Sequence, residues 1–206
     1  MSAASLIKSR TRVRDLAEVF TAEEQVRAML DLPGIAEACR RPEARFLEPA
    51  CGNGNFLVEI LERKIAVVAE MPTRRGKGDD PQPLFEFQVL VSVASVYGID
   101  ISEENVSEAR IRMHAAVSGF YASARNTWSP SPGFFAAIDA VLATNIVLGD
   151  SLNGADGILF VEYSVPKPLH FTRRWFRLSD LGNSRVKPVR HEKAVHYLNL
   201  ANAPRT

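Results

Sequence analysis

The sequence predicts a single α/β domain built on a short, mostly parallel sheet, with helices on both faces and a β-rich C-terminal extension. Short apolar runs alternate with longer stretches of helical periodicity as far as Asp150, which is typical of strands joined by helical crossovers. A length of 206 residues accommodates one ordinary domain, and 46% apolar with 24% charged residues is the composition of a soluble globular protein.

The first helix is expected shortly after Thr21. Thr21 with Glu24 three residues later forms a capping-box pattern, and Pro33-Gly34 ends the periodic stretch that follows. Three apolar residues are expected on its buried face: Val26, Met29 and Leu30. The run 45–50 then predicts a short buried strand, 51–54 a turn and 56–68 a helix.

A loop rich in proline, glycine and charge is predicted over 71–83. Apolar periodicity, with residues that start and stop helices, then predicts a helix over 84–94, a strand over 96–101 and a long helix from 102 past His114. After a break at 129–133, a helix is predicted over 134–142 and a strand over 145–148.

The character changes after Asp150. Two β-like runs, 158–163 and 170–178, are separated by a proline-containing link, which predicts either a hairpin or an extension of the sheet edge. The chain is therefore divided into a basic N-terminus (1–14), a main domain (15–163) and a basic β-hairpin strand with a C-terminal tail (164–206).

Charge is distributed unevenly along the chain. Residues 1–14 hold four Lys or Arg and no acid, and residues 164–206 hold nine against Asp180 and Glu192. Basic ends on an acidic body are compatible with a polyanionic partner such as DNA, because phosphate contacts supply most non-specific affinity. Solvated tails would show the same pattern.

Several classes of protein and site are not indicated. No apolar run approaches the eighteen or so residues that cross a bilayer, and no signal-peptide pattern opens the chain, so a cytoplasmic protein without a membrane partner is expected. Cys39 and Cys51 provide no disulfide framework. The four histidines have no metal-ligand spacing with them, so no metal is expected.

The run from Leu47 to Leu57, LEPACGNGNFL, is the strongest motif. Glycines at a strand-to-helix turn let backbone amides approach a ligand closely. The dinucleotide fingerprint is not met, since Leu57 stands where its third glycine belongs, and no phosphate-loop Lys-Ser or Lys-Thr pair follows. The turn therefore suits a ligand without a pyrophosphate.

This run resembles the first motif of adenine-N6 DNA methyltransferases, the modification subunits of restriction-modification systems. Segments 18–21, 97–100 and 145–150 resemble three further motifs in the expected order. Ala22 replaces the proline that usually follows the threonine. The resemblance covers roughly residues 17–151 and implies a Rossmann-like fold that binds S-adenosylmethionine.

The resemblance assigns the cofactor contacts residue by residue. Thr21 and the glycine loop would meet the methionine part, Asp100 the two ribose hydroxyls and Asp150 the adenine amino group. The implied cofactor-binding residues are Phe20, Thr21, Glu48, Pro49, Ala50, Cys51, Gly52, Gly54, Phe56, Asp100, Ile101 and Asp150.

Structural roles compete with some of these assignments. Asp100 can interact with the start of the next helix, Asp150 can be a turn acid, and Glu48-Pro49 can simply end a strand. Phe56 is suited to a core as well as to a pocket, and Cys51 is expected to be a small packing residue.

The catalytic tetrapeptide of the family, Asn or Asp followed by Pro-Pro and an aromatic residue, is missing. The catalytic residues are therefore unknown, with Asn153 or Tyr163 as conceivable substitutes. Three functions remain open: an active adenine-N6 DNA methyltransferase, an inactive or partial subunit that binds cofactor and assists a second subunit, and a small-molecule or protein methyltransferase.

The segment 171–177 interleaves cations with aromatic rings, a combination that can contact phosphates and stack on bases. The residues proposed to contact DNA are Arg173, Arg174, Trp175 and Arg177. The alternative is a strand whose Phe171, Arg173, Trp175 and Arg177 share one face and pack through the arginine stems.

Overall fold

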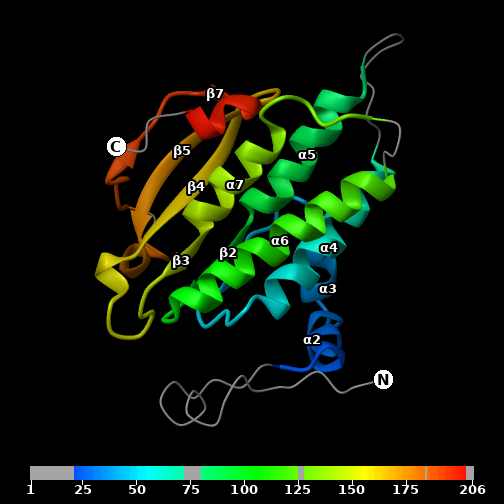
Figure 1. Ribbon diagram of the computed structural model, residues 1–206. Coiled ribbons are helices and arrows are strands. Elements are labelled where there is room, and N and C mark those ends of the chain that lie inside the picture. The colour runs from blue at the N-terminus through cyan, green and yellow to red at the C-terminus, as the bar shows by residue number, and fades with distance from the viewer. Residues whose placement is uncertain (1–20, 72–79, 125–127, 184, 203–206) are drawn as a thin grey trace.

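A computed structural model of the chain describes residues 21–71, 80–124, 128–183 and 185–202. Phe20 and the basic segment 1–14 lie outside the described residues. Two sheets and a layer of helices make up the rest (Figure 1).

The parallel sheet consists of β1 (Phe46–Glu48), β2 (Val96–Asp100) and β3 (Ile146–Leu148), in the order β1-β2-β3. Phe46 pairs with Val96 and Gly98 with Ile146, so the three strands end at the same edge of the sheet. β1 was expected to be buried, but Leu47 is 38% exposed because β1 is an edge strand.

Four long helices connect these strands: α4 (Asn55–Glu70), α5 (Gln82–Ala94), α6 (Glu103–Ala124) and α7 (Phe134–Asn145). All four were predicted, with ends that differ by a few residues. The largest shift concerns Asn145, which belongs to α7 rather than to the strand. Its buried side-chain amide donates to the carbonyls of Ala94 and Val96 and thereby ties the end of α7 to β2.

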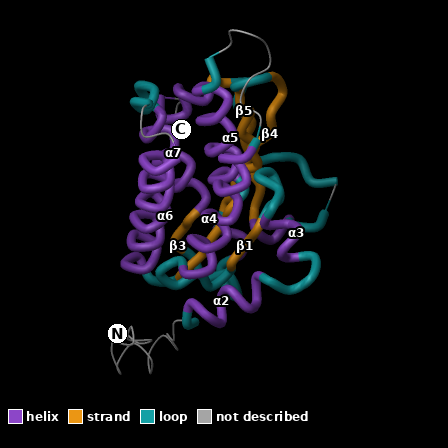
Figure 2. Tube along the Cα trace, turned by 90° about the vertical axis from the view of Figure 1, so that its right-hand side faces the viewer, coloured by secondary structure: helices purple, strands orange, loops and turns teal. Residues whose placement is uncertain are grey.

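The prediction that helices cover both faces of the parallel sheet is wrong. Gly98 faces Leu57 of α4, whereas Tyr97 and Ile99, on the opposite face, pack against Ile158 and Phe160. Figure 2 shows α6 and α7 on the side of the sheet away from β4 and β5. The strand order runs in one direction, and successive right-handed crossovers in one direction place their helices on one face.

The antiparallel sheet contains β4 (Leu159–Lys167), β5 (His170–Arg177), β6 (Arg190–His191) and β7 (Val195–His196), with β5 in the centre. β4 and β5 form a hairpin in this second sheet, which is separate from the parallel sheet. Of the two predicted arrangements, the hairpin is therefore observed and the extension of the parallel sheet is not. The division expected between 163 and 164 falls inside β4. Short 3-10 helices lie at Ala155–Gly157 (η1), Leu178–Asp180 (η2) and Tyr197–Asn202 (η3).

Two short helices, α2 (Glu23–Leu30) and α3 (Ile35–Cys39), precede the sheet. The predicted capping box is wrong, because the helix begins one residue later, with Ala22 at the N-cap and no side-chain cap. Met29 is exposed rather than buried, whereas Val26 and Leu30 face the core.

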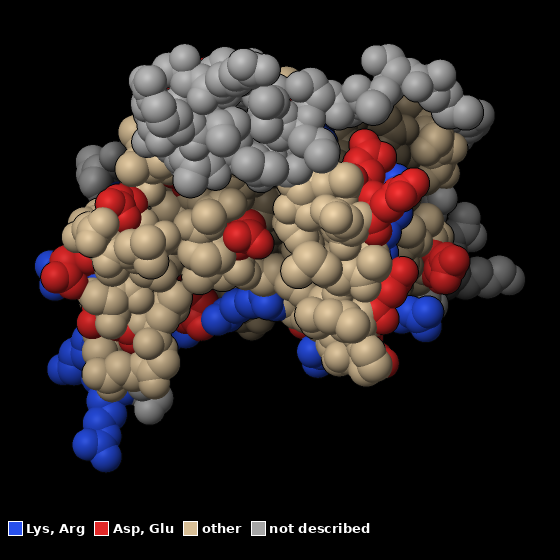
Figure 3. All heavy atoms as spheres, turned by 90° about the horizontal axis from the view of Figure 1, so that it is seen from below, with Lys and Arg blue, Asp and Glu red and all other residues tan. Residues whose placement is uncertain are grey.

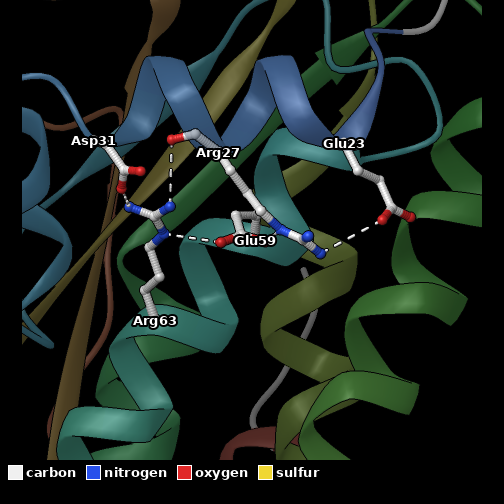
Figure 4. A network of polar contacts seen from close by, with 5 residues as sticks. All are labelled: Glu23, Arg27, Asp31, Glu59 and Arg63. Carbon is white, nitrogen blue, oxygen red and sulfur yellow. Dashed lines mark hydrogen bonds and ion pairs between the residues drawn. The ribbon is translucent and has the colours of Figure 1, made fainter.

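An ion-pair network joins α2 to α4 (Figure 4). Arg63 donates to Glu59 at 2.9 Å and to Asp31 at 2.7 Å, while Arg27 reaches Glu59 at 3.3 Å and Glu23 at 3.5 Å. This network fixes the start of the described chain beside the helix that follows the glycine loop.

Two buried charged groups tie loops to the core. Lys64 donates to the carbonyls of Arg41, Pro42 and Ala44 and, at 2.8 Å, to the hydroxyl of Ser95. Burial lowers the pKa of Lys64 to about 8.

The second buried charged group is Glu86 in α5. Its carboxylate accepts from Gln82 at 2.9 Å, the Ser131 amide at 2.8 Å, and the hydroxyls of Tyr121 at 3.0 Å and Tyr197 at 2.8 Å. Glu86 therefore clamps the C-terminal η3 onto the helical layer. In the part of the chain that the structure describes, no helix is both long and apolar enough to cross a membrane.

Candidate functional site

The glycine loop between β1 and α4 depends on two left-handed residues, Gly52 (φ 52°) and Gly54 (φ 90°). Gly54 is the N-cap of α4. A Cβ at Gly54 would lie 3.0 Å from the Cβ and 3.2 Å from the Cα of Ala109. Glycine is therefore required both by the backbone conformation and by the close approach of α6.

Asp100 ends β2 and joins the glycine loop to α6. Its Oδ2 accepts from the Gly52 amide at 2.8 Å, and its Oδ1 accepts from the Ser102 amide at 2.9 Å and the Asn105 side chain at 3.2 Å. The structural role considered for Asp100, interaction with the start of the next helix, is thus observed. The same bonds hold the carboxylate against the glycine loop.

Asp150 follows β3 and forms a turn. Its Oδ1 accepts from the amides of Leu152 at 2.9 Å and Asn153 at 3.0 Å, and its Oδ2 from the Asn153 side chain at 3.0 Å. These bonds, led by the one from the Asn153 side chain, lower the pKa of Asp150. The hydroxyl of Ser151 donates to the Pro49 carbonyl at 2.9 Å, so the turns after β3 and β1 are in contact.

Glu48 and Cys51 complete the turn after β1. Glu48 accepts from the Ala50 amide at 3.3 Å, and burial raises the pKa of its carboxyl in spite of that bond. Burial, followed by the charges of Asp100 and Glu48, raises the pKa of Cys51 to about 12. The Cys51 thiol is buried and protonated, as expected for a packing residue, and is no nucleophile.

A second group of polar residues braces the loop from α6 and was not predicted. Arg112 donates to the Asn53 carbonyl and the Asn55 side chain, both at 2.8 Å, and Glu108 accepts from the Asn53 side chain at 2.9 Å. Asn55 in turn donates to the Thr21 carbonyl at 2.9 Å. The signal available in the sequence was the spacing of Glu108 and Arg112 by one helical turn.

Glu48, Asp100 and Asp150 therefore lie together at the carboxyl ends of the three adjacent strands of the parallel sheet. Asn55 contacts Thr21, which lies just before α2. The carboxyl ends of the strands are therefore on the side of the molecule where α2 lies. Figure 3 views that side and shows acidic and basic side chains among mostly uncharged atoms, with a basic side chain in the hollow between two lobes.

The other predicted cofactor residues occupy varied positions. Phe56 is half-buried and packs against the core, whereas Ile101 is exposed at the end of β2. Of the conceivable catalytic substitutes, Tyr163 is buried and its hydroxyl lies 2.7 Å from that of Thr144, away from the strand ends. Asn153 remains beside Asp150.

A cavity of about 480 Å³ lies elsewhere. Its walls combine residues in or next to β1, β2, β4 and β5 with the segment after β5: Arg45, Phe46, Leu47, Tyr97, Phe160, Val161, Glu162, Phe176, Asp180, Leu181, Gly182 and Asn183. None of the predicted cofactor residues lines it. We locate the candidate cofactor site by the acids and the glycine loop, because this cavity has no comparable set of ligand-directed groups.

The predicted DNA-contacting residues differ sharply in exposure. Arg173 is 5% exposed and donates to Glu192 at 2.7 Å, so its guanidinium is not available at the surface. Trp175 is half-buried beneath the Arg190 guanidinium, which lies 4.4 Å from its ring. Arg174 pairs with Glu162 and Arg177 is exposed. Arg173 and Trp175 thus pack within the protein, as the alternative to DNA contact proposed. Of the predicted DNA-contacting residues, only Arg174 and Arg177 have cations at the surface.

Within the described ranges, no group of three or more His, Cys, Asp or Glu residues could hold a metal ion. No protein-family model, curated protein or solved structure matches the chain. The assignment of function must therefore be argued from the geometry at the strand ends.

Proposed function

We propose that the chain binds S-adenosylmethionine at the carboxyl ends of β1, β2 and β3 and is a protein of the adenine-N6 DNA methyltransferase type. The observation that carries this proposal is the joining of Asp100 to the Gly52 amide, which brings a strand-end carboxylate and a left-handed glycine loop into one site. Ligands of open parallel sheets bind outside the carboxyl ends of the strands.

The donor and acceptor groups fit such a ligand. A carboxylate offers about four acceptor positions. Asp100 uses three of them, so one remains for a ribose hydroxyl. Accepting both hydroxyls would require release of the Asn105 side chain, whose 3.2 Å contact is the longest of the three.

The remaining cofactor contacts follow from the same edge of the sheet. Glu48 and the glycine loop would face the methionine part, and the turn at Asp150 the adenine. S-Adenosylmethionine supplies an activated methyl group when bound. The residues of this chain would bind and orient it, which is the main contribution that a protein makes to such a transfer.

A titration with S-adenosylmethionine tests the proposal. We expect an affinity that is roughly micromolar, about −8 kcal/mol. Asp100→Asn keeps the shape of the side chain but removes its charge, and should weaken binding by about 1–3 kcal/mol through loss of charge-assisted bonds. Asp139→Asn is the matched control, because Asp139 is exposed on α7 and pairs with His114.

Two results would contradict the cofactor site. The first is the absence of both heat and thermal shift at about 1 mM cofactor. The second is equal binding by the wild type and Asp100→Asn, provided that circular dichroism shows both to be folded.

A partial subunit that binds cofactor and assists a partner is the second candidate, favoured by the missing Asn-Pro-Pro-aromatic sequence. Loss of one preorganised acceptor typically costs about 10²–10³ in rate. We therefore expect the chain alone to bind cofactor but to transfer tritiated methyl groups to DNA very slowly or not at all. Multiple turnover that yields N6-methyladenine would reject this second candidate in favour of an active enzyme.

A small-molecule or protein methyltransferase has weaker support. It would need an apolar pocket over the cofactor, and the 480 Å³ cavity contains none of the proposed cofactor residues.

A further inference from the structure

The 480 Å³ cavity is a groove along the free edge of β1. Its walls include the consecutive residues Arg45, Phe46 and Leu47 on one side and Phe160, Val161 and Glu162 of β4 on the other. Consecutive residues of a strand point to opposite faces. Because the cavity touches consecutive residues of β1 and β4, it reaches the edges of these strands, and its contacts with Tyr97 of β2 and Phe176 of β5 extend it onto one face of each sheet.

In the part of the chain that the structure describes, β1 has backbone hydrogen-bonding groups without a partner at this groove. The Phe46 amide donates to the Ser95 carbonyl at 2.9 Å, on the β2 side. Because backbone groups of successive residues point to opposite sides of a strand, the N–H and C=O of Leu47 point away from β2. Among the described residues β1 pairs only with β2. Such an edge is a template for another strand.

The backbone of β4 presents a second edge. The Ile158 carbonyl accepts from the Leu178 amide at 2.9 Å, which directs the backbone groups of even-numbered residues toward β5. Those of Val161 therefore point away from β5. The Val161 carbonyl indeed accepts from the Tyr97 hydroxyl at 2.8 Å, across the groove from β1.

The side chains of the groove define the chemistry of its occupant. Most of its lining is apolar and includes Phe46, Phe160, Phe176 and Leu181. Glu162 is already bound by Arg45 and Arg174. Within the described part of the chain, the Asp180 carboxylate has no cationic partner, whereas Glu162 has two.

We propose that this groove binds an extended segment of a partner polypeptide, which adds to β1 as a strand, places apolar side chains between β1 and β4, and carries a Lys or Arg for Asp180. Backbone bonds to an edge and pockets for alternate side chains are the general features of strand addition. The proposal does not depend on cofactor binding.

The probe is a fluorescein-labelled peptide of sequence Arg-Val-Thr-Val-Thr-Val, with the full chain labelled with ¹⁵N for amide exchange. We expect binding at roughly 0.1 mM by anisotropy. Exchange of the Leu47 amide should slow at least about tenfold, while that of Phe46, already bonded to Ser95, stays unchanged. This alternation is specific to strand addition.

Matched variants identify the surface. Leu181→Asp should weaken peptide binding at least about tenfold, whereas Ile111→Asp, at a similarly exposed position on α6, should not. Asp180→Asn should also weaken binding of this peptide, because it removes the charge that the peptide arginine would meet. The proposal is overturned by absence of binding at about 1 mM, by unchanged Leu47 exchange in the complex, by equal loss in the two Asp variants, or by light scattering that shows a dimer which excludes the peptide.

Discussion

Replacement of Gly98 by alanine tests whether the middle of β2 must lack a side chain for the glycine loop to pack on it. A Cβ at Gly98 would lie 2.7 Å from Leu57 Cδ1, 3.0 Å from Cys51 Sγ and 3.2 Å from Cys51 Cβ. Carbon atoms in contact are best separated by roughly 3.5–4.0 Å. Leu57 is fully buried in the core, so its side chain can yield only by displacing its neighbours, and Cys51 is part of the loop that positions Gly52.

Overpacking of this kind costs about 1–3 kcal/mol, and replacement of glycine by alanine returns about 0.5–1 kcal/mol through the unfolded state. We expect Gly98→Ala to reduce the unfolding free energy by about 1–2 kcal/mol in urea titrations. For a chain of this size, Tm should fall by about 2–8 °C. If Cys51 is the obstacle, Gly98→Ala should cost at least about 0.5 kcal/mol less in a Cys51→Ala background.

Gly119→Ala is the matched control. Gly119 lies inside α6, and nothing is within 4 Å of a Cβ built on it. This variant should gain about 1 kcal/mol from helix propensity. The reasoning would be refuted if Gly98→Ala were as stable as Gly119→Ala. If removal of the Cys51 sulfur left the cost of Gly98→Ala unchanged, Leu57, the closer neighbour, would be the obstacle.

Three other predictions concern buried and exposed charges. The pKa of Lys64 is about 8 in the folded state against 10.5 in the unfolded state, so the unfolded chain binds more protons between these values. The unfolding free energy of the wild type, relative to that of Lys64→Met, should therefore rise from pH 8 to 9.5 by at most about 1.4 kcal/mol per pH unit. A difference between the two proteins that does not change with pH would contradict this. Tyr197→Phe, which removes a donor from the buried Glu86 carboxylate, should cost about 1.5–3 kcal/mol in urea titrations, against about 1 kcal/mol for Tyr97→Phe, whose buried hydroxyl donates to the neutral Val161 carbonyl; equal costs would reject a charged Glu86 clamp. Arg173→Ala should cost about 1.5–3 kcal/mol because it removes one of the two arginines that bind Glu192, the other being Arg190. Arg177→Ala should leave stability within about 0.5 kcal/mol and, if Arg177 meets a phosphate, reduce the salt slope of DNA binding by about 0.9; the reverse order of stabilities would contradict the burial of Arg173.

Local patterns were sufficient to predict most elements. The apolar periodicity of α4 to α7 and the glycine turn after β1 depend on neighbouring residues, and the structure confirms these elements. The errors arose where a distant contact decides the outcome. Asn145 joins the helix because its side chain bonds to Ala94 and Val96, about fifty residues earlier.

The coverage of the sheet could not be predicted from alternation alone. Alternating strands and helices indicate a parallel sheet but not the strand order, and the order β1-β2-β3 decides that the helices share one face. In the same way, the pattern of arginine and aromatic residues over 171–177 does not reveal that Glu192 returns to pair with Arg173. Charge in a sequence is informative about a surface only where the fold leaves it exposed.

The candidate cofactor site and the groove lie on different parts of the same strand. Glu48 and the turn after it, at the end of β1, belong to the proposed cofactor site, whereas Leu47 faces the groove. A strand that pairs with Leu47 would order the edge of β1 one residue before Glu48. If both proposals hold, occupation of the groove should therefore alter the affinity for S-adenosylmethionine, and the cofactor should alter the affinity for the peptide by the same factor.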